Sequence, residues 1–134
     1  MTEIPKISEP KEIYHLFHEV LQLHLRTEEY VYLLGMNTKG SILGIFEVGH
    51  GSPSTCIMNS YGIFQRLLLI GATAFVVVHN HPSGDPTPSL QDREVTEKLK
   101  KQAELMEIAM LDHVIIGWNS FFSIFLMKEV DNME

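Results

Sequence analysis

Two histidines, a serine and an aspartate lie close enough in the sequence to build a metal site. His79 and His81 end an apolar run, and Ser89 and Asp92 follow a loop, Pro82–Pro88, that carries three prolines. Side chains alternate between the two faces of a strand, so His79 and His81 point to the same side. Two imidazoles and one carboxylate leave the fourth tetrahedral position of a zinc ion for water, which is the layout of a catalytic zinc site.

The proline-rich loop is the element that must bring Asp92 to the histidines. Proline restricts the backbone and lowers the entropy lost when a loop becomes ordered. Ser89-x-x-Asp92 also fits a capping box at the start of a helix, and capping alone explains these two residues. The two histidines upstream favour the additional role of Asp92 as a metal ligand.

A zinc-activated water needs a base, and Glu47 is the candidate. It interrupts the apolar run IFEV, although a glutamate on a solvated edge strand is the alternative explanation. For His113, contact with the local backbone is favoured over a position near the metal. Cys56, which is the single cysteine, is interpreted as a small buried hydrophobe.

The hydrophobic pattern predicts a mixed α/β (α+β) fold, with helices packed on a central sheet. Residues 1–10 form a loose lead-in and residues 11–134 a single domain. The predicted helices are Lys11–Leu25, Ser60–Ile70 and a long helix that Ser89 opens, with Val95, Leu99, Ala103, Met106 and Met110 as its apolar stripe. The predicted strands are Glu29–Met36, Ser41–Val48, a short Ser54–Met58, Ala74–His81, Leu111–Gly117 and Phe121–Phe125, with a turn at 37–40.

The composition narrows the class of protein. The chain has 134 residues, a formal net charge of −7 and 45% hydrophobic residues, as expected for a globular domain. An acidic chain lacks the basic field that nucleic-acid binders use against phosphates, so direct DNA binding is not expected. No apolar run is long enough to span a bilayer. One cysteine excludes an internal disulfide and indicates the cytoplasm.

The stretch HNHPSGDPTPSLQD resembles the JAMM motif of the JAB/MPN metalloprotease superfamily, and specifically the bacterial RadC family. The stretches GIFEVGHGS (Gly44–Ser52) and LDHVIIG (Leu111–Gly117) agree, and the resemblance extends from about Glu12 to Ser123. It implies a mixed sheet flanked by helices, with the layering of cytidine deaminases.

The resemblance also implies a mechanism. A zinc ion, Zn²⁺, is held by His79, His81 and Asp92. Glu47 is the general acid/base, and Ser89 hydrogen-bonds the attacking water or the developing oxyanion. The reaction is hydrolysis of a peptide or isopeptide amide, so a protein or peptide is the expected partner.

The chain departs from the family pattern in two places. RadC proteins often carry an N-terminal helix-hairpin-helix region, for which this sequence has no room, and the turn Gly117–Ser120 replaces an acidic glycine turn. The missing region weakens the link to DNA. The alternative function is a non-catalytic, zinc-stabilised interaction module in a DNA-repair or mobile-element context. Nothing in the sequence indicates an oligomeric state.

Overall fold

A mixed six-stranded sheet forms the centre of the molecule in a computed structural model, which describes residues 6–51 and 60–131. The strand order is β2-β1-β3-β4-β5-β6. The strands are β1 (Tyr30–Met36), β2 (Ile42–His50), β3 (Ala74–Asn80), β4 (Ala109–Ile116), β5 (Ser120–Ser123) and β6 (Lys128–Asp131). β3 and β4 are parallel, and the other neighbours are antiparallel. The predicted mixed sheet with flanking helices is confirmed.

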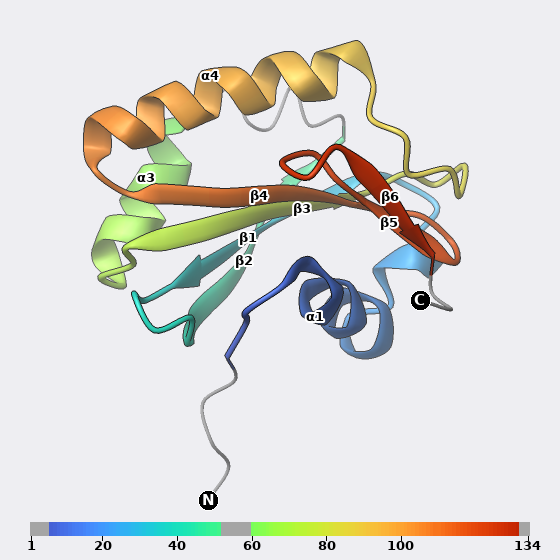
Figure 1. Ribbon diagram of the computed structural model, residues 1–134, viewed down its shortest axis with the longest axis horizontal. Coiled ribbons are helices and arrows are strands. Elements are labelled where there is room, and N and C mark those ends of the chain that lie inside the picture. Colours follow the sequence, from blue (N-terminus) through green and yellow to red (C-terminus); the bar gives the residue numbers. More distant parts are fainter. Residues whose placement is uncertain (1–5, 52–59, 132–134) are drawn as a thin grey trace, which may run out of the picture.

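The helices cover both faces of this sheet. α4 (Leu90–Met106) lies on one face together with α3 (Ser60–Leu69), and α1 (Pro10–His15) lies on the other (Figure 1). α1 continues into a π-helical turn, η1 (Leu16–Val20), and a 3₁₀ turn, η2 (Leu23–Leu25), follows. None of the helices in the described part of the chain is long and apolar enough to cross a membrane.

Two separate hydrophobic cores result from these three layers. The α3/α4 core contains Val31, Leu33, Ile63, Leu67, Phe75, Val77, Val95 and Leu99 among its buried residues. The α1 core contains Ile13, Tyr14, Phe17, Leu23, Tyr32, Leu34, Val76 and Val78 among its buried residues. Successive residues of β1 and β3 enter opposite cores, because side chains alternate across a strand. This alternation decides which side chains can meet at the ends of the strands.

The first predicted helix is wrong in its length. The helical segment ends at Val20, which is 69% exposed, and not at Leu25. Gln22 then takes a left-handed conformation with φ of 50°. The reversal at Gln22 turns the chain so that Leu23 is fully buried in the α1 core, which explains why the helix stops.

The long helix also ends earlier than its apolar stripe suggests. It stops at Met106, because Glu107 adopts a left-handed conformation with φ of 58°. Met110 therefore belongs to β4 and not to the helix. β2 runs on through Gly49 and His50, beyond the predicted end of the strand at Val48.

The remaining sequence predictions concern a turn, the last strand of the sheet and the segment around Cys56. The predicted turn at 37–40 is confirmed, with Gly40 at a φ of 82° and its N–H donating to the carbonyl of Asn37. β6 was not predicted. The predicted short strand Ser54–Met58 and the buried Cys56 lie outside the described residues.

Candidate metal centre

The end of β3 presents both histidines to the α4 side of the sheet. His79 pairs with Val31 of β1 and Ile115 of β4 and is fully buried. His81 follows the strand, and its backbone N–H donates to the carbonyl of Ile116 over 3.0 Å. The Nε2 atoms of His79 and His81 lie 3.1 Å apart. The prediction that the two rings share one side of the strand is confirmed.

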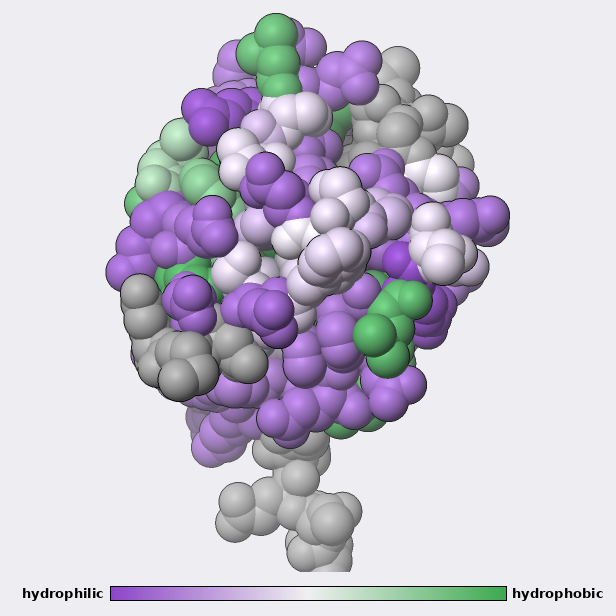
Figure 2. Space-filling view, turned by 90° about the vertical axis from the view of Figure 1, so that its right-hand side faces the viewer, coloured by the Kyte–Doolittle hydropathy of each residue, from purple (hydrophilic) through white to green (hydrophobic). Residues whose placement is uncertain are grey.

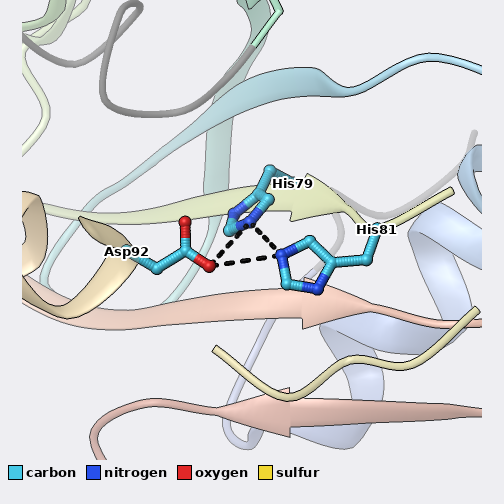
Figure 3. Close-up of side chains that lie close together, drawn as sticks. All are labelled: His79, His81 and Asp92. Atoms are coloured by element: carbon cyan, nitrogen blue, oxygen red, sulfur yellow. Dashed lines mark hydrogen bonds and ion pairs between the residues drawn. The ribbon is translucent and has the colours of Figure 1, made fainter. Parts of the chain in front are cut away.

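Asp92 brings the third ligand atom from the first turn of α4 (Figure 3). Its Oδ2 lies 3.2 Å from Nε2 of His81 and 3.6 Å from Nε2 of His79. Two ligands of a tetrahedral zinc ion, each about 2.0–2.1 Å from it, lie about 3.3–3.4 Å apart. The three separations, at 3.1, 3.2 and 3.6 Å, fit this triangle without rearrangement. These residues could therefore hold a metal ion.

Ser89 and Asp92 form the capping box that the sequence predicts. The backbone N–H of Ser89 donates to Oδ2 of Asp92 over 2.9 Å, and the N–H of Asp92 donates to Oγ of Ser89 over 3.0 Å. Burial alone would raise the pKa of Asp92, but its interactions with the rings of His79 and His81 and the hydrogen bond from the Ser89 N–H outweigh it and hold this pKa well below its usual range. Capping therefore fixes the carboxylate as an anion that faces both histidines.

The loop after β3 supports His81 through a backbone carbonyl. Nδ1 of His81 lies 2.9 Å from the carbonyl oxygen of Asp85, which can only accept, so Nδ1 carries the hydrogen. Gly84 adopts a φ of 91°, and Trp118 donates its backbone N–H to the Gly84 carbonyl over 3.1 Å. A Cβ atom on Gly84 would lie 2.4 Å from the indole of Trp118. The indole therefore lies directly against the loop that orients His81.

The core supports His79 through a second histidine. Nδ1 of His79 lies 2.7 Å from Nε2 of His113, which pairs with Val77 in the β3–β4 register and is fully buried. Nδ1 of His113 lies 2.6 Å from the hydroxyl of Thr96 on α4. Burial lowers the pKa of His113 well below its ordinary value, and the neighbouring His79 lowers it further.

The preferred interpretation of His113 is therefore wrong. Its ring contacts His79 and Thr96 rather than the local backbone. The available sequence signal was a histidine inside the apolar strand LDHVIIG. That signal did not identify His79 as the partner of His113, because the contact between them depends on the parallel pairing of β3 with β4.

Glu47 lies on the other side of the sheet. It pairs with Tyr32, and its Oε1 accepts a hydrogen bond from the Tyr32 hydroxyl over 3.3 Å. Tyr32 belongs to the α1 core, whereas Phe46 and Val48 on either side of Glu47 pack against the α3/α4 core. The structure brings together His79, His81, Asp92 and Ser89, but it does not bring Glu47 to them.

Glu29 is a carboxylate that interacts electrostatically with His81 and Asp92, and sequence reasoning missed it. It directly precedes β1, and alternation places it on the same side as Val31, the partner of His79. Burial raises the pKa of Glu29, the charge of His81 opposes this rise and the charge of Asp92 adds to it. Its electrostatic coupling to both residues agrees with a position beside the three ligands.

Asn80 fixes the start of β1 next to the end of β3. Its Oδ1 accepts from the backbone N–H of Tyr30 over 2.8 Å, and its Nδ2 donates to the carbonyl of Glu28 over 2.9 Å. Glu29 lies between these two anchored residues. One side chain of β3 therefore determines where Glu29 can lie relative to His79 and His81.

The surface at this end of the molecule is mainly hydrophilic, with apolar residues in separate patches (Figure 2). A hollow of about 520 Å³ lies beside the loop that carries His81, lined by His24, Leu25, Arg26, Thr27, Pro82, Trp118 and Asn119. Within the site, the side chain of His81 is 15% exposed and that of Asp92 5%, while His79 is fully buried. His81 is thus the most accessible of the three candidate ligands.

Comparison with known proteins agrees with this arrangement. The sequence matches the RadC-like JAB domain over residues 7–130. A UPF0758 protein of Clostridium botulinum (strain Alaska E43 / Type E3) is 38% identical over 119 residues, which cover 89% of this chain and 51% of that protein. UPF0758 proteins of Desulfitobacterium hafniense (strain DSM 10664 / DCB-2) and Geotalea uraniireducens (strain Rf4) are 35% and 34% identical over 120 residues, 90% of this chain and 52% of each relative. The chain thus spans about half the length of these relatives, and it belongs to the family of RadC-like JAB domains.

Proposed function

We propose that the chain is a zinc-dependent hydrolase of amide bonds in a peptide or isopeptide substrate. The observation that carries this proposal is the triangle of His79 Nε2, His81 Nε2 and Asp92 Oδ2, whose sides fit a tetrahedral zinc ion. Imidazole and carboxylate ligands together suit zinc. Membership of the RadC-like JAB domain family supports the same chemistry.

The three ligands differ in the charge that they bring to the ion. His79 and His81 offer neutral imidazole nitrogens, and the anionic Asp92 lowers the charge of the occupied site. A zinc ion in this position would supply the Lewis acid that lowers the pKa of water toward about 7 and polarises a carbonyl.

We assign the role of general acid/base to Glu29 in place of Glu47. Glu29 interacts electrostatically with His81 and Asp92, and its raised pKa suits a group that accepts a proton from water and later donates it to the leaving amine. Glu47 is exposed and bonded to Tyr32 on the opposite face. Ser89 accepts the backbone N–H of Asp92 through its Oγ, so its hydroxyl hydrogen is directed away from that bond and can donate to a substrate oxygen.

The test compares Glu29→Gln with Glu47→Gln, the matched control on the other face of the sheet. Zinc is measured by elemental analysis of the purified proteins, and hydrolysis is measured on a panel of peptides and isopeptide-linked substrates. We expect about one zinc ion per chain in all three proteins. Glu29→Gln should lose about 10²–10⁴-fold in rate, because the amide cannot accept the proton, and Glu47→Gln should cleave like the wild type.

Two results would contradict the proposal. If the wild-type protein took up no zinc at neutral pH, the proposed metal site would be excluded. Equal cleavage by Glu29→Gln and the wild type would remove Glu29 as the base. Zinc binding without cleavage of any substrate in the panel would favour the zinc-stabilised interaction module.

A further inference from the structure

A chain of buried hydrogen bonds connects the backbone of one candidate ligand to the ring of another. The hydroxyl of Thr96 lies 2.6 Å from the backbone carbonyl of Asp92, one turn earlier on α4. The same hydroxyl lies 2.6 Å from Nδ1 of His113, and Nε2 of His113 lies 2.7 Å from Nδ1 of His79. Thr96, His113 and His79 are all fully buried or nearly so, with at most 2% exposed, so water does not compete for these bonds.

The Thr96 hydroxyl and the two neutral imidazoles in this series of hydrogen bonds each carry one hydrogen. A neutral imidazole carries one N–H and one lone pair, and a hydroxyl carries one hydrogen. The Asp92 carbonyl can only accept. If the Thr96 hydroxyl donates to this carbonyl, the Thr96 oxygen accepts from Nδ1–H of His113. Nε2 of His113 then accepts from Nδ1–H of His79. In this direction, Nε2 of His79 keeps a free lone pair.

The opposite direction has the opposite result. If Thr96 donates to Nδ1 of His113, then His113 donates from Nε2 to His79, and the hydrogen of His79 moves to Nε2. That hydrogen could donate to Nε2 of His81, 3.1 Å away. The Thr96 hydroxyl would then have no hydrogen for the Asp92 carbonyl, although the two oxygens lie 2.6 Å apart and a carbonyl can only accept. This short contact favours the direction that leaves Nε2 of His79 free.

We propose that Thr96, acting through His113, is a positioning residue that sets the tautomer of His79 and so prepares Nε2 to bind a metal ion. The same hydroxyl contacts the backbone of Asp92, so the start of α4 and the ring of His79 are arranged together. The tautomer part of this proposal concerns the metal-free protein, and only its consequence for zinc rests on the proposed metal site.

The test replaces Thr96 by valine, which keeps the branched shape and removes the hydroxyl, and by serine, which keeps the hydroxyl. Long-range ¹H–¹⁵N NMR of the histidine rings, in zinc-free protein, reports which nitrogen of His79 carries the hydrogen. The His79 signals are assigned from their loss in His79→Gln. We expect the Nδ1–H form in the wild type and Thr96→Ser. In Thr96→Val, Nδ1–H of His113 would have no acceptor, so His113 should change tautomer and His79 should move to the Nε2–H form.

The second readout is zinc affinity, measured by competition with a chromophoric chelator. Loss of a partner that orients a ligand typically lowers metal affinity by about 10–100-fold, and we expect this loss in Thr96→Val but not in Thr96→Ser. Thr96→Ala provides the same comparison if the valine protein does not fold. Retention of the Nδ1–H form of His79 in a folded variant that lacks the hydroxyl would overturn the proposal, and so would a changed tautomer with unchanged zinc affinity. If the wild type bound no zinc, the metal site would fail, whereas the tautomer readout would still decide the role of Thr96.

Discussion

The two histidines of the candidate site are held by regions of different character. His79 lies inside the sheet, and its Nδ1 contacts another buried imidazole, that of His113. His81 lies one residue beyond β3, and its Nδ1 donates to the carbonyl of Asp85 in the loop. A carbonyl accepts in every state, whereas an imidazole can accept or donate. The loop therefore fixes the tautomer of His81 by itself, but the core fixes that of His79 only through further residues.

The two supports also differ in what surrounds them. The residues around His79 are packed between the sheet and α4, where an unpartnered polar atom is costly. The loop around His81 is partly exposed, Asp85 included, so water can replace a lost contact. Replacing His79 should therefore affect folding, whereas replacing His81 should mainly affect metal binding.

The largest expected effect is the difference in stability between His79→Ala and His81→Ala. His79→Ala leaves a buried cavity and an unpartnered Nε2 on His113, so the free energy of unfolding should fall by about 2–4 kcal/mol. His81→Ala should lower it by about 1 kcal/mol or less, because water reaches the Asp85 carbonyl. Urea unfolding with a chelator present measures both values without a contribution from zinc. Equal losses would show that the core and the loop do not differ in this way.

A smaller effect is expected at Gly84, with Gly71 as its matched control. Both glycines have positive φ, at 91° and 70°, so alanine brings a similar backbone penalty of about 1–2 kcal/mol at each. Only the Cβ atom at Gly84 meets the Trp118 indole, at 2.4 Å, whereas the Cβ atom at Gly71 has nothing within 4 Å. Gly84→Ala must therefore displace the loop that orients His81.

Zinc affinity distinguishes these two variants. We expect it to fall about 10-fold in Gly84→Ala and to stay near the wild-type value in Gly71→Ala, since displacing a group that orients a ligand weakens metal binding. The chelator competition assay measures both. A similar fall in the two variants would mean that backbone strain, and not the position of the loop, lowers the affinity.

The same contrast explains how much of the site could be predicted from the sequence. His79, His81, Ser89 and Asp92 lie within fourteen consecutive positions, and strand alternation and capping rules apply over such short distances. Thr96 and His113 reach His79 only through the packing of α4 and the pairing of β3 with β4. The local support of His81 follows from the loop, whereas the remote support of His79 needs the fold.

The position of Glu47 could not be predicted for a related reason. Alternation correctly separates Glu47 from Phe46 and Val48, but the sequence does not say which face of β2 matches the face of His79. β1 is almost entirely buried on both sides, so its hydrophobic pattern does not reveal which face Glu29 shares. Strand types and most boundaries were predictable because local periodicity determines them. The breaks at Gln22 and Glu107 were not, because they depend on what the following residues bury.

The smallest expected effect tests how Trp118 contributes to the loop side. Its indole packs on Gly84, but the residue is 57% exposed, and its link to the Gly84 carbonyl runs through its own backbone N–H, which alanine keeps. Trp118→Ala alone should therefore lower zinc affinity only about 2–3-fold, below the roughly 10–100-fold typical of groups that orient a ligand directly. In this background Gly84→Ala no longer meets an indole, so the double variant should bind zinc more tightly than Gly84→Ala alone. The double-mutant cycle should give a coupling of about 0.5–1.5 kcal/mol between the two positions. Strictly additive losses would show that the indole does not set the position of the loop, and the orientation of His81 would then rest on the turn and the Asp85 carbonyl alone.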